Sequence, residues 1–142
     1  MANSKKKFRT FEAYATHPMR ALQAWQILIS AAKNRQIHSY LSLSKLMYGK
    51  SAAGVLGQVL GHVAFYCKDS RLPPLTVIVV GQKRGTPGAL IPVKPEDQDV
   101  EREKVFKHDW YNVIPPTPGE LKAAFDLPRD QLKRSPQVER RA

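Results

Sequence analysis

Two adjacent prolines, Pro73 and Pro74, divide the first two-thirds of the chain into parts with different hydrophobic patterns. Before them, over residues 17–68, apolar residues recur at the three- and four-residue spacing of amphipathic helices. After them, residues 75–80 are mostly β-branched and almost wholly apolar, which is typical of a buried strand. Because proline ends a helix firmly, the chain is predicted to pass from helices to strands at this point.

The helical part is predicted to contain three helices. The first begins near Thr16, and its residues divide into an apolar stripe (Leu22, Trp25, Ile29, Ala32) and side chains that face elsewhere (Arg20, Gln23, Gln26, Lys33). The second occupies residues 41–48 and stops at Gly49, a favoured C-terminal residue. The third runs from about residue 51 to residue 68. The last two helices and the tight turn between them form a helix-turn-helix pattern.

The apolar run at residues 75–80 is predicted to be the first strand of a β-hairpin. Residues 82–88 contain the glycines and the proline of a turn, and residues 89–93 can return antiparallel to the first strand. Three helices followed by a hairpin is the winged-helix arrangement. We therefore expect an α+β fold, a winged helix-turn-helix domain that spans residues 17–94.

A helical extension that packs on this domain is predicted over residues 95–128. Its first helix is expected to run from Pro95 to about His108, with Val100, Val105 and Phe106 facing inward. Its second helix opens with Thr117 and Glu120, which have the spacing of a capping box. Residues 129–142 lack periodicity and are expected to be a disordered tail, and residues 1–16 are expected to be a basic arm.

The positive charge is concentrated in the first two-thirds of the chain. The formal net charge is +11, and residues 1–94 hold 14 Lys and Arg against two acids, Glu12 and Asp69. The remaining residues hold nine bases and ten acids. A polyanion is the natural partner of such a surface.

The composition favours a cytoplasmic location, in the nucleoid when the protein is bound to DNA. No apolar run approaches the roughly 20 residues that span a bilayer, and the N-terminus lacks the apolar core of a signal peptide. The single Cys67 cannot form an internal disulfide. No membrane association is expected.

The predicted third helix, residues 51–68, carries the most specific functional signal. One face is apolar (Val55, Leu56, Val59, Leu60, Val63, Tyr66, Cys67), and the other holds glycines and polar residues (Lys50, Gly54, Gly57, Gln58, Gly61, Phe65, Lys68). Each glycine inside a helix costs about 1 kcal/mol relative to alanine, so a close approach by a partner is expected. The partner is either duplex DNA, with Gln58 at a base edge and Lys50 at a phosphate, or another protein segment.

The predicted wing, residues 82–88, adds two cations, Lys83 and Arg84, at its tip. Together with Arg35, Lys45 and Lys50 they are positioned to neutralise phosphates on either side of one groove.

Several short stretches share one order and spacing with a known family: Ala24–Leu28, Ser39–Tyr40, Leu43, Gly49, Val55–Gly57 and Val79–Gly81. In these stretches the chain resembles the DNA-binding domain of alkylguanine-DNA alkyltransferases and alkyltransferase-like proteins. The resemblance covers about residues 21–88 and implies a winged-helix fold, with Tyr40 beside a DNA phosphate. The full predicted DNA-contacting set is Arg35, Ser39, Tyr40, Lys45, Lys50, Ser51, Gly54, Gly57, Gln58, Lys83 and Arg84.

This chain departs from that family at the residues that carry its chemistry. Where the family has its Pro-Cys-His-Arg nucleophile motif, this chain reads Leu75-Thr-Val-Ile78. Gly54 stands where the family has the arginine that fills the base stack after flipping. Alkyl transfer is therefore excluded, and base flipping is not expected.

No other stretch of the sequence predicts catalysis, a metal or a cofactor. Cys67 falls on the apolar helix face, and the four histidines (His17, His38, His62, His108) show no ligand spacing. The acids of residues 96–103 are interpreted as the solvated face of a helix. We expect a protein that is not an enzyme.

Two alternatives to DNA binding stay open at this point. One is a protein-interaction module that docks a partner through the glycine face and the segment around Trp110, as an accessory subunit or inhibitor in a phage-defence or restriction setting. The other is RNA binding, which is less favoured because no strand carries a paired aromatic platform.

Overall fold

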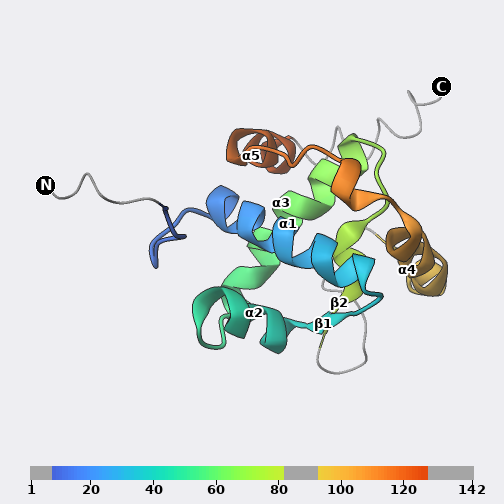
Figure 1. The fold of residues 1–142 in the computed structure, drawn as a ribbon, viewed down its shortest axis with the longest axis horizontal. Coiled ribbons are helices and arrows are strands. Elements are labelled where there is room, and N and C mark those ends of the chain that lie inside the picture. Colours follow the sequence, from blue (N-terminus) through green and yellow to red (C-terminus); the bar gives the residue numbers. More distant parts are fainter. Residues whose placement is uncertain (1–7, 82–92, 128–142) are drawn as a thin grey trace, which may run out of the picture.

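The computed structural model of the protein describes residues 8–81 and 93–127, which form five α-helices and two short strands (Figure 1). The helices are α1 (His17–Lys33), α2 (Tyr40–Tyr48), α3 (Ala53–Asp69), α4 (Gln98–Lys107) and α5 (Pro118–Asp126). The strands are β1 (His38–Ser39) and β2 (Val79–Val80), and short 3-10 turns occur at Leu75–Ile78, Pro95–Asp97 and Trp110–Asn112. The fold is α+β and mostly helical, which confirms the predicted class.

The helices begin and end at the signals that the sequence carries. The hydroxyl of Thr16 accepts a hydrogen bond from the Met19 amide at the start of α1, and Pro18 lies in the first turn. Gly49 ends α2 with φ 76°, a left-handed conformation that favours glycine. At the start of α5, Thr117 and Glu120 form the predicted capping box, with each side chain bonded to the backbone of the other residue.

The predicted strand over residues 75–80 is wrong for most of its length. Leu75–Ile78 is a 3-10 turn with four buried side chains, and only Val79–Val80 is extended. A short apolar run bounded by proline suits a buried turn as well as a strand, and periodicity cannot separate the two. Residues 82–92, which hold the predicted hairpin turn and most of the return strand, lie outside the described residues.

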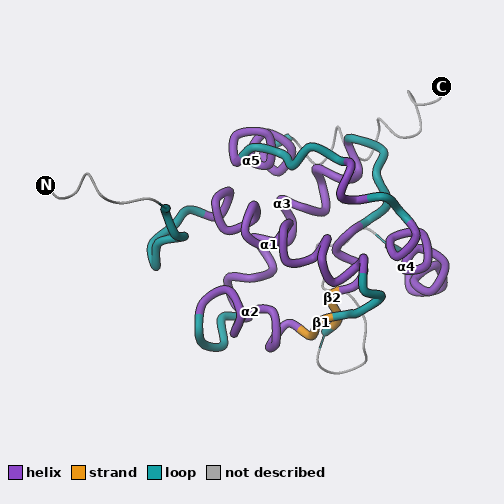
Figure 2. The backbone as a smooth tube through the Cα atoms, viewed as in Figure 1, coloured by secondary structure: helices purple, strands orange, loops and turns teal. Residues whose placement is uncertain are grey.

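The described strands pair in parallel, not as a hairpin. β1 and β2 lie side by side (Figure 2), with His38 opposite Val79 and Ser39 opposite Val80. Parallel neighbours need a crossover connection, and α2 and α3 provide most of it here. The pair therefore joins the two ends of the segment that contains α2 and α3.

Trp25 lies at the centre of the core. Its ring contacts Trp110 and Tyr66 edge-on, with ring centroids 5.7 and 5.9 Å apart. Trp110 is fully buried, and its indole N–H donates a 2.7 Å hydrogen bond to the carbonyl of Val105. The segment after α4 is thereby part of the same core as α1 and α3.

The C-terminal extension covers one side of the α1 and α3 pair. α5 packs on α3 and α1, and α4 packs on the 3-10 turn at Leu75–Ile78. Figure 1 shows α2 on the side of this pair opposite α5. The extension thus leaves α2 and the start of α3 uncovered.

One residue of the extension, Val100, does not face the core as predicted. Val100 was expected to face inward, but its side chain is 58% exposed. α4 instead faces the core with Val105 and with Arg102, whose Nε donates to the carbonyl of Val77. Residues three or four positions apart share one face of a helix, as Arg102 and Val105 do. Val100 has neither spacing to them and therefore lies on another face.

Candidate nucleic-acid interface

The first half of α3 presents an open glycine surface. A Cβ atom built on Gly54 or on Gly57 would meet no other heavy atom within 4 Å. Gly54 and Gln58 are exposed, and Gly57 is partly exposed. A ligand can therefore approach the helix backbone closely along this stretch.

The second half of α3 is covered by the protein's own chain, so for this half the alternative of a protein segment against the glycine face applies. Gly61 is buried, and Phe65 is 8% exposed with its ring 6.3 Å from that of Phe125 on α5. An amphipathic pattern shows which residues of a helix are apolar, but it does not show which neighbour covers its other face. At the outer edge of the predicted apolar face, Val55 is 40% exposed.

The N-terminus of α3 has no side-chain cap. Ala52 is the N-cap residue and makes no side-chain hydrogen bond, and the first turn contains no acidic residue. The first amide N–H groups of a helix lack partners within it and carry the positive end of the helix dipole. With exposed Ser51 directly before it, this end of α3 suits an anionic ligand.

Two cations lie in the segment that leads into α3. Lys45 in the last turn of α2 and Lys50 in the turn after Gly49 are both exposed. No acidic residue occurs in the sequence between Glu12 and Asp69. We call the set Lys45, Lys50, Ser51, Gly54, Gly57 and Gln58 the α2–α3 surface.

Ser39 and Tyr40, two further predicted contacts, lie at the opposite end of α2. The Ser39 hydroxyl caps α2 by accepting a 2.9 Å hydrogen bond from the Ser42 amide. The Tyr40 side chain is half-buried and packs against the core, and this burial raises the pKa of its hydroxyl. Capping and packing thus account for both residues, and we leave them out of the α2–α3 surface.

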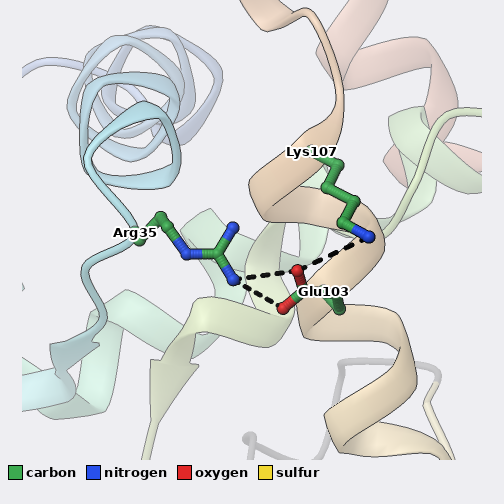
Figure 3. A network of polar contacts seen from close by, with 3 residues as sticks. All are labelled: Arg35, Glu103 and Lys107. Carbon is green, nitrogen blue, oxygen red and sulfur yellow. Dashed lines mark hydrogen bonds and ion pairs between the residues drawn. The ribbon is translucent and has the colours of Figure 1, made fainter.

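Arg35 is held by α4 (Figure 3). Its Nη2 lies 2.7 and 2.8 Å from the two carboxylate oxygens of Glu103, and Lys107 lies 3.8 Å from the same carboxylate. The hydrogen bond from Arg35 lowers the pKa of Glu103, and the guanidinium also lies over the Phe106 ring. We therefore leave Arg35 out of the candidate interface. Lys83 and Arg84 lie outside the described residues.

One functional candidate, Arg20, was missed by the sequence analysis. It was expected to face away from the core, but it is only 4% exposed and bonds to the backbone at Glu12 and at Met47. Its position carried a signal, because Arg20 lies four residues before buried Ala24 and eight before buried Leu28. A charged residue on the core row of a helix indicates a buried polar contact.

Cys67 lacks the environment of a reactive thiol. It is fully buried, and desolvation raises the pKa of the thiol to about 12. The side chains of Leu75–Ile78 are buried as well. A thiol with so high a pKa stays protonated, and hence weakly nucleophilic, at neutral pH.

This environment predicts the labelling behaviour of Cys67. At pH 8 we expect a thiol-specific chromogenic disulfide to label the native protein at least about a hundredfold more slowly than the urea-unfolded protein. All labelling reports on Cys67, because the chain has one cysteine. Equal labelling rates in the two states would show that the thiol is accessible.

The acids of α4 face cations of the same helix. Asp99 contacts Arg102 at 3.4 Å, and Glu101 contacts Lys104 at 3.2 Å. Over residues 8–81 and 93–127, no group of three or more His, Cys, Asp or Glu side chains has an arrangement suited to a metal ion. No helix in these ranges is both long and apolar enough to cross a membrane.

The arrangement offers a helix-start surface that combines an open backbone with exposed lysines and an exposed amide side chain, without an acid in the segment. Such a surface can bind phosphates by charge and base edges by hydrogen bonds. Comparison with protein-family models, curated proteins and solved structures gives no significant match to this chain.

Proposed function

We propose that this protein binds duplex DNA through the α2–α3 surface and catalyses no reaction on it. The observation that carries the proposal is the open backbone of α3 at Gly54 and Gly57. The major groove of DNA admits an α-helix, and a helix without side chains on one face can enter it deeply. Gln58 then reaches a base edge, because an amide side chain can donate and accept hydrogen bonds with adenine.

The distribution of charge supports a polyanionic partner. Lys45 and Lys50 are exposed in the segment that leads into α3, and residues 1–94 contain only two acids. Exposed cations neutralise phosphates and release the counterions that surround DNA. The uncapped start of α3 adds partial positive charge at the same place.

The proposal takes the winged helix-turn-helix interpretation, and the resemblance to the alkyltransferase DNA-binding domain, as its framework. In it, α2 and α3 are the helix-turn-helix pair and α3 is the recognition helix. The interpretation assigns the role of the wing to residues 82–88, which lie outside the described residues, and phosphate contacts to Lys83 and Arg84. The protein acts in the cytoplasm, on the nucleoid. Buried Cys67 supports a non-catalytic role.

A competition experiment tests this function. The affinity for a short fluorescent duplex is measured by anisotropy at two salt concentrations, with unlabelled duplex, single-stranded DNA and RNA as competitors. We expect duplex to compete best and the affinity to fall steeply with salt. RNA as the strongest competitor would favour the RNA-binding alternative, and absence of saturable binding to the duplex would contradict the proposal.

Removing the two lysines of the α2–α3 surface is expected to change the salt dependence. Lys45→Ala and Lys50→Ala should each make the slope of log K against log salt shallower by about 0.9, the value for one phosphate contact. A salt titration of each variant measures this slope. Lys122→Ala is the matched control, because Lys122 is exposed on α5 and paired with Asp126. An equal change in the control would indicate that only net charge matters.

Exposed apolar side chains favour a protein partner as the second candidate. Ile37 and Leu46 are 50% and 61% exposed, and Val55 is exposed near the start of α3. Such a partner would cover part of the α2–α3 surface, as for an accessory subunit or an inhibitor. The segment around Trp110 was predicted to dock such a partner, but Trp110 is fully buried and is not accessible to one. Saturable binding of one purified protein together with weak, salt-insensitive duplex binding would favour this candidate.

A further inference from the structure

Arg20 is a buried cation without a carboxylate partner among the described residues. Its side-chain partners are the carbonyls of Glu12 and Met47 and the side-chain oxygen of Gln23, at 3.0, 2.8 and 2.7 Å. The guanidinium lies over the Tyr48 ring, 4.2 Å from its centroid. A buried charge is costly, so an arginine kept at this position points to a specific task.

The guanidinium joins two segments that are far apart in the sequence. Met47 lies in the last turn of α2, where helix carbonyls lack partners within the helix and favour a cation. Glu12 lies in the N-terminal arm, and its carbonyl also accepts a 3.0 Å hydrogen bond from the Ala15 amide. One side chain thus fixes a turn of the arm against the end of α2.

The part of the arm that the structure describes, residues 8–16, has exposed aromatic and cationic side chains. Phe8 and Tyr14 are 72% and 83% exposed, and Arg9 is exposed without an ion pair to any described residue. Figure 1 shows this segment on the same side of the molecule as the turn between α2 and α3. The hydrogen bonds of Arg20 to the carbonyls of Glu12 and Met47 tie this segment to the end of α2, which leads into the turn before α3.

We propose that Arg20 is a positioning residue that holds the N-terminal arm beside the turn between α2 and α3, so that Arg9 contacts the same DNA duplex as Lys50. This inference rests on the proposed function and extends the DNA-contacting surface onto residues 8–16. An arm that is already fixed in place loses less conformational entropy when it binds DNA than a flexible arm does. It therefore contributes more to the affinity.

The planar guanidinium suits this role better than an ammonium group would. It directs Nη1 to the α2 carbonyl and Nη2 to the arm carbonyl at the same time. A lysine at this position keeps the charge, but it lacks the fixed fork and cannot hold both carbonyls in the same geometry. Arg20→Lys is therefore the variant that releases the arm without removing the charge.

The first experiment measures release of the arm in the absence of DNA. Cleavage by trypsin after Arg9 is followed by mass spectrometry in the full chain and in Arg20→Lys. We expect cleavage at this bond at least about fivefold faster in the variant, because proteolysis follows the population of the open form. Thermal unfolding checks that the variant is folded. Gln23→Ala, which removes one partner of Arg20 at the surface of α1, should shift cleavage in the same direction by less.

The second experiment is a double-mutant cycle on duplex binding. Arg9→Ala should make the salt slope shallower by about 0.9 in the wild-type background and by less than half of that in Arg20→Lys. Lys122→Ala is the control, and its effect should be the same in both backgrounds.

The outcomes separate the two proposals. Duplex binding with an Arg9→Ala effect that is equal in both backgrounds would overturn the role of Arg20 and leave the proposed function standing. Unchanged cleavage after Arg9 in both Arg20→Lys and Gln23→Ala would overturn it as well. If the wild-type protein binds no duplex, the proposed function fails, and this extension of it fails with it.

Discussion

Replacing Trp110 with alanine is expected to lower the free energy of unfolding by about 3–5 kcal/mol, the usual range for a large aromatic residue removed from a core. Trp110 is fully buried, packs edge-on against Trp25 and donates to the Val105 carbonyl. The substitution leaves a cavity and an unpaired carbonyl at once. Since small domains have total stabilities of about 5–15 kcal/mol, chemical denaturation should show a large shift of the midpoint.

The neighbouring residue supplies the control for this effect. Tyr111 is 57% exposed, and its ring contacts the Lys33 ammonium at 5.5 Å. Tyr111→Ala should lower the free energy of unfolding by less than about 1 kcal/mol, because it removes little buried area. Similar losses in the two variants would show that Trp110 does not anchor the extension to the core.

Introducing glutamate at Gly57 is expected to weaken duplex binding at least about tenfold, because it places a long side chain and a negative charge where DNA is proposed to approach. The folded protein should tolerate the change, since a Cβ at this position meets no heavy atom within 4 Å. Glutamate also has a higher helix propensity than glycine. Anisotropy titrations should therefore show a lower affinity for the duplex. Thermal unfolding should show a stability that is unchanged or higher.

Two further variants isolate the cause of the lost affinity. Gly57→Ala should raise the free energy of unfolding by about 0.5–1 kcal/mol and change duplex affinity only slightly. Ala123→Glu adds the same charge at an exposed position of α5, away from the α2–α3 surface. Should Ala123→Glu weaken binding as strongly as Gly57→Glu, the open face of α3 would not be where DNA lies.

The parts of the fold that local chemistry determines could be predicted from the sequence. Pro18 and Thr16 set the start of α1, Gly49 sets the end of α2, and the spacing of Thr117 and Glu120 sets the start of α5. Each of these signals acts within a few residues of the chain. Helix existence and helix ends were accordingly predicted well.

The parts that depend on distant neighbours could not be predicted in the same way. The apolar run at Leu75–Ile78 is a 3-10 turn that packs against α1, α3 and α4. Val79–Val80 pairs with a strand that lies before α2 in the sequence. Phe65 is buried because α5 lies over it. A single-sequence pattern gives the polarity of each face, but the partner of that face depends on tertiary packing.

The candidate site also contains residues whose position local sequence predicts and residues whose position depends on tertiary packing. From the cost of glycine in a helix, the sequence analysis predicted that DNA or another protein segment approaches this face closely, and the structure leaves Gly54 and Gly57 open to a ligand. Arg35 was predicted as a phosphate contact from its charge alone, and the structure pairs it with Glu103 from an element much later in the chain. Arg20 was wrongly predicted to face away from the core. Its place on the core row indicates burial, but its contact to the arm is set by the fold and not by its neighbours in the sequence.

The two-residue pairing of β1 with β2 closes a ring of chain that contains the whole of α2 and α3. Pairing of the two strands closes the loop between them and restricts the conformations that α2 and α3 can adopt. The entropy cost of closing this loop falls on the strand pairing and not on the contacts of the two helices. The helix pair is therefore expected to open and close as one cooperative unit, with amide exchange in α2 and in the first half of α3 rising together whenever His38 separates from Val79.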